Sequence, residues 1–388
     1  LTSILAWVVG RLSEAERDVM IQLTVFEERF TAQSAEQVVE LEAHAAMAGA
    51  RLSESTAETL ERRPPPVADL CRRFEKLGLL SSAVTLAGEP GYVMAPLVRR
   101  HLGELASPET MTRVRDRLGS HLAHLGADES LLALHRRGGW MRRGRYLEAF
   151  DDAVAAHKHA LDKGKIGLAA MLGRAAAAAE VILGRPASAA RLLLPGCGDE
   201  VPAPLRLRCT LDHGRALTLD GRPPRAAEVL NQAERLASDE PARRADALRA
   251  RGELALLEGH RMMARRYLLE ARDVAWSCGD RLGAAEALLS VSLLDPPTEA
   301  VQMLEQALES FLQMAAQHMA ALAHEHLGLA HERADAPRKS AAALDAALEI
   351  HHRQGDRRAA ARVLARRGSV GLATGEVKYA VDTLSQAA

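Results

Sequence analysis

A pattern of small residues recurs every 36 to 40 residues from about residue 130 to the end of this 388-residue chain. In each copy a turn is followed, after five residues, by the first buried position of a helix, and the turns contain Gly144, Gly184, Gly221, Gly259 and Gly375. The small buried positions are Ala149, Ala189, Ala226, Ala264, Ala300 and Ala380, with Ser340 in the same place in one copy. A chain that repeats one such unit folds by stacking neighbouring units on each other.

Each unit is predicted to be a helical hairpin. A leucine follows most of the small positions after four residues, which places both on one helical stripe. Twelve residues before the small position, a glycine marks close contact on the preceding helix, at Gly214, Gly252, Gly328 and Gly368. The fifth unit fits this register when it is anchored at Ser292 and has lost four residues at its turn, between Leu294 and Pro297. Four residues are about one helical turn, so the loss keeps the buried face in phase.

These landmarks resemble the tetratricopeptide repeat, which is about 34 residues long. The resemblance implies an α-solenoid of about seven hairpins, a right-handed superhelix whose concave surface is lined by the first helix of each hairpin and binds the partner. Aromatic residues make up only 3 % of the chain, which favours a mainly α fold and disfavours an all-β one. Turn glycines at this spacing also exclude a long coiled coil.

The first 106 residues follow a different pattern. A capping box at Ser13 and Glu16 begins a helix, and further helices are predicted at Ser34–Leu41 and Val67–Leu77. Two strands are predicted at Leu79–Leu86 and Gly91–Met94. Three helices followed by a β-hairpin is the order of a winged-helix module. The predicted domains are therefore a winged-helix module at 1–106 with an insertion at about 42–66, a helical connector at 107–129, and the repeat array at 130–388.

The head resembles the winged-helix part of bacterial signal-transduction ATPases with numerous domains (STAND proteins), such as LuxR-type and antibiotic-regulator-type regulators. The residues that carry this resemblance are Leu1, Leu5, Trp7, Leu12, Ser13, Glu16, Leu23 to Phe26, Phe30, Thr31, Val67 to Leu80, and Tyr92 to Leu102. The resemblance implies an ATPase domain before Leu1, where ATP or ADP would bind, and the absence of an initial methionine also suggests a fragment. No GxxxxGK[ST] loop occurs in the chain, and Ala95 stands where the family has its nucleotide-sensing histidine. We therefore expect no cofactor in this chain.

Composition and motifs exclude several classes of function. The net charge of -1 lacks the basic excess of a nucleic-acid wrapper, and no apolar run is long enough to span a membrane, so we expect a cytoplasmic protein without a membrane partner. The four cysteines are spread out and are expected to be buried and unpaired. No catalytic motif occurs, and carboxylates such as Asp151 and Asp152 are expected on helix surfaces. We expect a protein that is not an enzyme.

The candidate partner site is a row of arginines on the first helices of successive hairpins. The row consists of Arg174, Arg208, Arg215 and Arg249. Such a row suits an acidic peptide or a phosphorylated ligand. The alternative is local pairing, of Arg208 and Arg215 with Asp212 and of Arg249 with Asp246 and Glu253, with only Arg174 lacking a partner. The single asparagine, Asn231, falls on a second helix, which favours a folded partner over a threaded tail.

Three further groups have a structural and a functional interpretation. Four histidines on one helix suggest a metal site or, more simply, solvated side chains: His318, His324, His326 and His331. Cations on the third head helix suggest DNA contact or internal packing: Arg72, Arg73 and Lys76. A basic run suggests a solvated turn or a docking surface for an acidic partner: Arg136, Arg137, Arg142, Arg143 and Arg145. We interpret none of them as a metal or DNA site.

The preferred function is a regulatory or sensor fragment of a signalling ATPase, which binds a protein or small effector through the array and restrains its own ATPase domain. One alternative is a transcriptional regulator that binds DNA through the winged helix. Another is a stand-alone scaffold that only assembles partners.

Overall fold

The computed structural model describes residues 2–41, 66–135 and 139–376, with a few isolated positions after Glu376. By contacts the chain divides into two compact units, which we call the head unit (Leu1–Ala127 with Gly144–Ala179) and the array unit (Asp128–Arg143 with Glu180–Ala388). The domain boundaries expected after residues 106 and 129 do not coincide with this division. The expected insertion at about 42–66 lies, apart from Pro66, outside the described residues.

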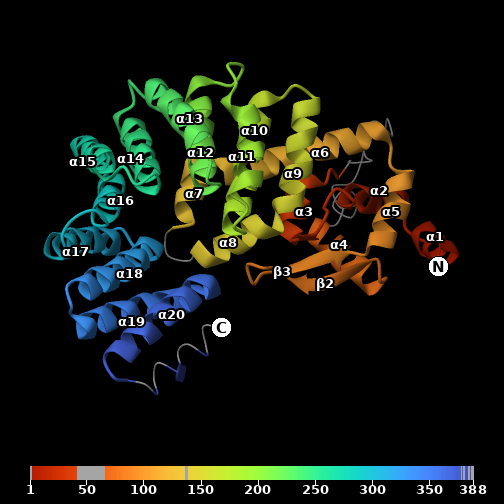
Figure 1. The fold of residues 1–388 in the computed structure, drawn as a ribbon. Helices are drawn as coiled ribbons and strands as arrows, with labels where there is room; N and C mark the ends of the chain where they lie inside the picture. The colour runs from red at the N-terminus through yellow and green to blue at the C-terminus, as the bar shows by residue number, and fades with distance from the viewer. Residues whose placement is uncertain are drawn as a thin grey trace, which may run out of the picture. The chain divides into compact units, whose positions relative to one another are not determined.

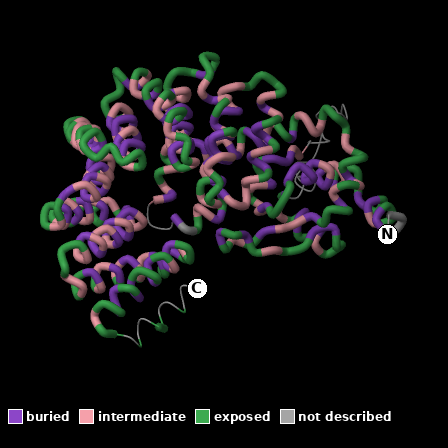
Figure 2. Tube along the Cα trace, viewed as in Figure 1, coloured by how far each residue is buried: buried purple, intermediate pink, exposed green. Residues whose placement is uncertain are grey.

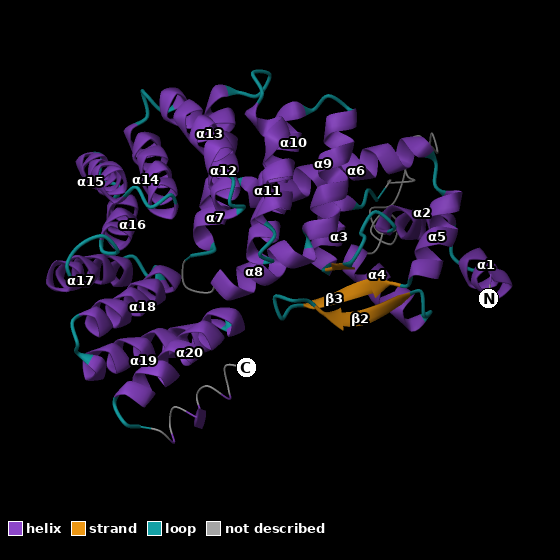
Figure 3. Ribbon diagram, viewed as in Figure 1, coloured by secondary structure: helices purple, strands orange, loops and turns teal. Residues whose placement is uncertain are grey.

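The head unit combines helices with one small sheet (Figure 3). Its elements are α1 (Thr2–Gly10), α2 (Glu14–Leu23), β1 (Arg29–Phe30), α3 (Ala32–Val38), α4 (Val67–Lys76), β2 (Leu80–Val84), β3 (Pro90–Met94), α5 (Pro96–Leu105), α6 (Pro108–Leu122), η1 (Ala123–Gly126), α9 (Phe150–Asp162) and most of α10 (Ile166–Ile182). The sheet is antiparallel in the order β1-β3-β2. The predicted hairpin is present as β2 and β3, whereas β1 was not predicted.

Local signals in the sequence set the ends of the head helices. The capping box forms as predicted: the Ser13 backbone N–H donates to the Glu16 carboxylate at 2.9 Å, and the Glu16 N–H donates to the Ser13 hydroxyl at 3.3 Å. Helix α3 begins at Ala32, two residues earlier than predicted, because the Thr31 hydroxyl caps it. Gly78, at φ 72°, ends the turn after α4 in a left-handed conformation that suits glycine.

The first hairpin of the repeat does not follow the predicted register. Helix α6 packs against α9, so the predicted connector is the first helix of that hairpin. A Cβ on Gly119 of α6 would touch Ala156 of α9 at 3.8 Å, which gives Gly119 the close-contact position. Gly144 lies inside α8 (Gly139–Glu148) and not in a turn, and Ala149 is only half-buried between α8 and α9. The spacing of Gly144 and Ala149 therefore imitates the repeat without forming it.

The array unit is a series of antiparallel helical hairpins (Figure 1). Its elements are α7 (Asp128–Ala133), the start of α8, α11 (Pro186–Leu193), η2 (Leu194–Cys197), α12 (Ala203–Leu219), α13 (Pro223–Leu236), α14 (Pro241–Leu257), α15 (Arg261–Ser277), α16 (Arg281–Val291), α17 (Pro297–Gln313), α18 (Gln317–Arg333), α19 (Pro337–Gln354) and α20 (Arg357–Ala373). Helix α16 has 11 residues where α12 and α14 have 17, which agrees with the predicted shortening of the fifth unit. The mainly α class and the repeat array are confirmed.

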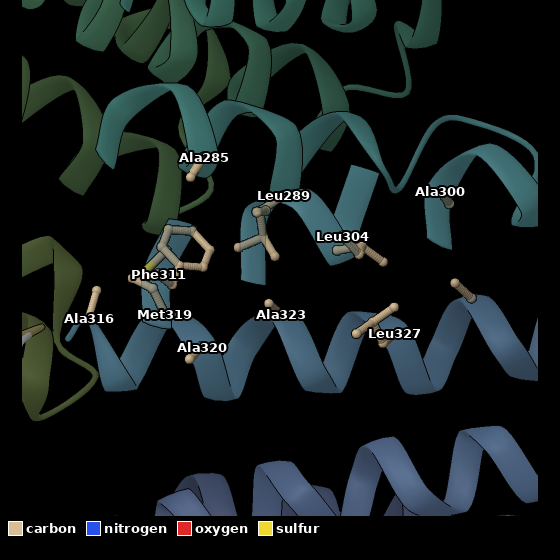
Figure 4. Packing of buried hydrophobic residues seen from close by; sticks show 12 residues of the cluster. Ala285, Leu289, Ala300, Leu304, Phe311, Ala316, Met319, Ala320, Ala323 and Leu327 are labelled. Carbon is tan, nitrogen blue, oxygen red and sulfur yellow. The ribbon is translucent and has the colours of Figure 1, made fainter. Parts of the chain in front are cut away.

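The predicted packing register holds in the later hairpins. Four of the predicted small positions are 0 % exposed: Ala189, Ala226, Ala264 and Ala300. A Cβ on Gly214 would lie 2.4 Å from Leu230, and one on Gly252 would lie 2.5 Å from Leu268. Buried and exposed residues alternate along each helix (Figure 2), and side chains of α16, α17 and α18 share one core (Figure 4). Ala380 lies outside the described residues.

No helix in the described part of the chain is long and apolar enough to cross a bilayer. All four cysteines are free thiols, and Cys71 and Cys209 are buried as predicted. The prediction is wrong for Cys278, which is exposed, and Cys197 is half-buried.

Candidate functional site

The first helices of successive hairpins form a continuous charged surface within the array unit. Helix α12 contacts α14, α14 contacts α16, and α16 contacts α18. We call the surface that α12, α14, α16, α18 and α20 form together the inner face. Arginines and carboxylates of neighbouring first helices form ion pairs on it, as between α12 and α14 and between α14 and α16.

Arg249 on α14 is the centre of a charge cluster on the inner face. Its guanidinium lies 2.8 Å from Glu286 of α16, 2.9 Å from Glu253 and 3.5 Å from Asp246. Arg215 of α12 reaches the same Asp246 carboxylate at 3.3 Å. These ion pairs link three consecutive first helices, so the cluster fastens neighbouring repeats to one another.

Burial and opposite charge compete in this cluster. Burial lowers the pKa of Arg249, but the carboxylates around it outweigh burial and raise that pKa above its ordinary value. Burial raises the pKa of Asp246, but Arg215, Arg249 and Arg243 outweigh it, and the pKa of Asp246 is lowered. Both groups therefore stay charged at neutral pH. Glu286 has a raised pKa, because burial outweighs the nearby Arg249 and Arg215.

The predicted arginine row is engaged by the chain itself. The predicted pairs of Arg249 with Asp246 and Glu253 are present. Arg215 pairs with Asp246 of the next hairpin, and Arg208 pairs with Asp128 at 3.0 Å. Both of these partners are distant in sequence, whereas the partner expected for Arg208 and Arg215 was the local Asp212.

Arg174 does not share the inner face of the array unit. It belongs to the head unit, is 5 % exposed, and donates from Nη1 to the backbone carbonyl of Gly126 at 2.7 Å. The prediction that it has no partner is therefore wrong. A buried guanidinium that satisfies a carbonyl at the end of η1 stabilises the structure, because an unpaired carbonyl there would be costly.

A segment of the chain lies on the inner face. Residues 128–143, which we call the arm and of which the structure describes 128–135 and 139–143, belong to the array unit, although the residues on either side belong to the head unit. At the start of the arm, the Asp128 carboxylate pairs with Arg208 of α12 and with Arg243 of α14. Further along, the His135 carbonyl accepts from the backbone N–H of His318 on α18 at 3.4 Å. The described residues of the arm thus contact α12, α14 and α18, and Figure 1 shows its helix α7 beside α12.

Arg143, at the other end of the arm, contacts a cluster formed by His318, His351 and Asp356. Arg143 Nη1 donates to Asp356 at 2.7 Å, and Nη2 lies 3.2 Å from His318 Nδ1. One ligand atom from each of the three cluster residues lies within 4.8 Å of the others, a spacing that a metal ion could use. Here the guanidinium of Arg143 is the cation at this position.

Two histidines around the arm are held neutral. Burial, followed by the charge of Arg143, lowers the pKa of His318 to about 3. Burial, followed by Arg143, Arg249 and Arg215, lowers the pKa of His135 to about 4. A neutral imidazole accepts a hydrogen bond from a guanidinium, whereas a charged one would repel it. The neutral rings of His318 and His135 can therefore lie beside the Arg143 guanidinium without charge repulsion.

The other predicted candidate residues are the histidines of α18 and the cations of α4. The four histidines of α18 are half-buried, and among the described residues only His318 takes part in a metal-compatible cluster. On α4, Arg72 pairs with Asp69, and Arg73 pairs with Glu16 at 2.9 Å.

Of the basic run, Arg136 and Arg137 lie outside the described residues. The others lie on α8 and not in a turn: Arg142 donates to the Ala133 carbonyl at 3.0 Å, Arg143 binds the cluster above, and Arg145 pairs with Glu89. The prediction of a turn is therefore wrong for these three, although Arg145 is exposed as predicted.

Sequence reasoning missed the contacts that define the site. Asp128, Arg243 and Asp356 were not candidates, because each partner lies more than 100 residues away or on the far side of several repeats. The one available signal was the basic run, which contains Arg143. Asp152 was also misjudged: it is 3 % exposed and accepts from the Glu27 N–H at 2.6 Å in the head unit.

No protein-family model matches the sequence, and no curated protein matches it either. Among solved structures, a STAND protein with a tetratricopeptide repeat sensor from Pyrococcus horikoshii is similar at 14 % identity and a TM-score of 0.49, over 96 % of this chain and 56 % of that one. The chain therefore spans little more than half of that protein. A putative kinesin light chain with tetratricopeptide-like repeats from Podosopora anserina is similar at 14 % identity and a TM-score of 0.40, over 47 % of this chain and 93 % of that one. At such identities the likeness concerns the fold.

Proposed function

We propose that this chain is the sensor part of a signal-transduction ATPase, and that its array recognises a protein or small effector through the inner face. The observation that supports this most directly is that the inner face already holds a segment of polypeptide, the arm, by side-chain ion pairs at both ends. A surface that binds one segment in this way has the chemistry to bind another.

Binding of this kind does not need catalysis or a cofactor, and we propose neither for this chain. The head unit, with its helix, strand, helix, helix and hairpin order, is interpreted as a winged helix that packs inside the larger protein. Two of the three cations on α4 are engaged by carboxylates, which makes DNA a poorer candidate partner. We further propose a bacterial origin and a cytoplasmic location.

The partner-binding role is tested by comparing inner-face and outer-face variants as bait. Arg208→Ser combined with Asp356→Asn removes charge from the inner face, whereas Arg235→Ser removes an exposed arginine from the second helix α13. Cross-linked partners should be lost from the first bait and kept by the second. Equal capture by both baits would contradict a site on the inner face.

Two measurements test the proposed parentage. The reading frame upstream of Leu1 should encode a GxxxxGK[ST] loop, and its absence would leave only a scaffold role. Isothermal titration of this chain with ATP and ADP should show no sub-micromolar site, because it has no phosphate loop and carries Ala95 at the sensor position. Tight binding or sustained turnover would contradict the proposal.

A further inference from the structure

We propose that the arm, residues 128–143, is an internal ligand of the inner face, and that the partner of this face carries a carboxylate at one end of its bound segment and an arginine at the other. This deepens the proposed function by naming the chemistry of the partner. It rests on two separate binding sites on the array, one for each end of the arm.

The first site takes a carboxylate. Asp128 of the arm lies 3.0 Å from Arg208 Nε and also pairs with Arg243. Arg243 is independently positioned by Asp246, 3.2 Å away on the same helix. The site therefore has one arginine held in place by the array, and two guanidinium groups converge on one carboxylate, an arrangement that favours a carboxylate or another oxyanion.

That carboxylate joins a larger group of charged side chains on the inner face. Four arginines meet there, Arg208, Arg215, Arg243 and Arg249. The array supplies three carboxylates to them, Asp246, Glu253 and Glu286. Asp128 of the arm supplies a further carboxylate, which pairs with Arg208 and Arg243. When the arm leaves, these two arginines lose that carboxylate and can pair with another acidic group.

The second site takes an arginine. Asp356 accepts from Arg143 through Oδ2, while its Oδ1 accepts from the Ala359 N–H at 3.1 Å and caps α20. His351 is 0 % exposed and is held by Glu325 at 2.9 Å, and Glu325 is in turn held by Arg362. Each of these bonds lies within the repeats and does not involve the arm. The site is therefore preorganised and persists when Arg143 is absent.

The contacts of the arm suit a ligand that exchanges. Helix α7 of the arm has no buried residue, whereas Leu134, directly after it, is buried. The ion pairs at its two ends involve side chains that keep part of their exposure, 35 % for Arg208 and 22 % for Arg143. Pairs of this kind are weakened by salt and depend on the arm being tethered beside its site. A free segment with the same end groups competes for the same positions.

A binding experiment in trans tests the proposal. The probe is a fluorescent synthetic peptide with the sequence of residues 126–145, measured by anisotropy against the full chain. In the double variant Asp128→Ser with Arg143→Ser, the arm loses both end groups while the array sites stay intact. The peptide should bind this variant at least tenfold more tightly than the unaltered chain, and the affinity should fall as salt is raised.

Matched variants show whether the expected sites are used. Arg145→Ser removes a neighbouring arginine that pairs with Glu89 in the head unit, so it should leave peptide binding at the level of the unaltered chain. Asp356→Asn keeps a helix-capping side chain but removes the charge, so adding it to the double variant should abolish the gain. A peptide that carries Ser in place of its own arginine at 143 should bind at least tenfold more weakly.

The proposal is overturned if the folded double variant binds the peptide no better than the unaltered chain, or if Asp356→Asn has no effect. Circular dichroism and the melting temperature establish that each variant is folded. If the peptide does not bind, the arm is a permanent part of the array. The proposed partner site could then still lie elsewhere on the chain. If the peptide binds but the capture experiment finds no partner, the result contradicts the proposed function. It still supports the arm as an internal ligand.

Discussion

Single residues in this chain show how the same residue type takes opposite roles in different surroundings. Gly252 allows α15 to approach α14, because a Cβ at Gly252 would lie 2.5 Å from Leu268 Cγ. Gly103, inside α5, has no atom within 4 Å of such a Cβ. Both are helical glycines in the sequence, but only the first is required by packing.

This difference predicts the effect of alanine at each position. Gly252→Ala should lower the free energy of unfolding by about 1 to 3 kcal/mol, because overpacking against Leu268 exceeds the gain in helix propensity. Gly103→Ala should raise it by about 0.5 to 1 kcal/mol, because only the propensity changes. Urea unfolding of both variants measures the difference. A gain in stability for Gly252→Ala would show that the helices do not meet there.

Asp152 gives a second prediction for a single residue. Burial, partly offset by the Glu27 N–H, raises the pKa of Asp152 from 3.8 to about 7. A carboxyl with a raised pKa stabilises the fold at low pH, and this contribution is lost as pH rises from about 4 through 7. Asp152→Asn keeps the acceptor for Glu27 and removes the titration. The variant should therefore be more stable than the unaltered protein at pH 8 by about 1 kcal/mol or more, and the gap should shrink at pH 5.

Denaturant unfolding at the two pH values measures this gap. A difference between Asp152→Asn and the unaltered protein that stays constant from pH 5 to pH 8 would mean that the carboxyl is ionised throughout this range.

Helices and hairpins were predictable where the signals are local. The capping box at Ser13 and the turn at Gly221 were identified from neighbouring residues. In the array, the same turn pattern occurs in several hairpins, which made each turn easier to recognise. Strand β1 was missed because its two residues form a strand only by pairing with β3, more than 60 residues later. The first hairpin was misplaced for the same reason, since α6 meets α9 across the whole arm.

The later hairpins predict where a long side chain cannot be accommodated. Ala264 on α15 is 0 % exposed, and a Cβ on Gly252 would lie 3.4 Å from its carbonyl oxygen. Ala264→Arg should destabilise the array by about 3 kcal/mol or more, because it combines overpacking with burial of an unpaired charge. Arg235→Ala, an exposed change on α13, should cost about 0.5 kcal/mol or less. Equal melting temperatures for these two variants would contradict the repeat register.

Across the whole molecule, the site could not be predicted because it joins parts of the chain that no repeat spacing connects. The sequence places Arg208 and Arg249 on first helices, and this much was predicted. It does not indicate that Asp128 lies against Arg208, or that Arg143 reaches Asp356 across 213 residues. The arm interrupts a hairpin, so its contacts follow from the path of the entire array and not from any window of sequence.

Buried groups in the two units are expected to contribute to acid stability with opposite signs. In the head unit, Asp152 has a raised pKa and favours the folded state as pH falls. In the array unit, His318 and His135 have lowered pKa values and disfavour it, because the unfolded imidazoles take up protons first. The groups that face His318 are Arg143 from α8 and Asp356 from the start of α20. The rings of His135 and His351 also lie beside it.

His318→Gln separates the histidine effect from all other titrations. Glutamine stays neutral and can still accept from Arg143, so at pH 7.5 the variant should lose only about 1 kcal/mol or less through imperfect packing. As pH falls from 6.5 toward 3, unfolded His318 binds a proton that the folded state excludes, and the unaltered protein loses stability that the variant keeps. The deficit of the variant should therefore narrow and then reverse by pH 4.5. Urea unfolding across this range measures it, with His135 contributing equally to both proteins. Parallel stability curves would show that His318 is protonated beside Arg143, and that the neutral ring is not what holds the arginine in place.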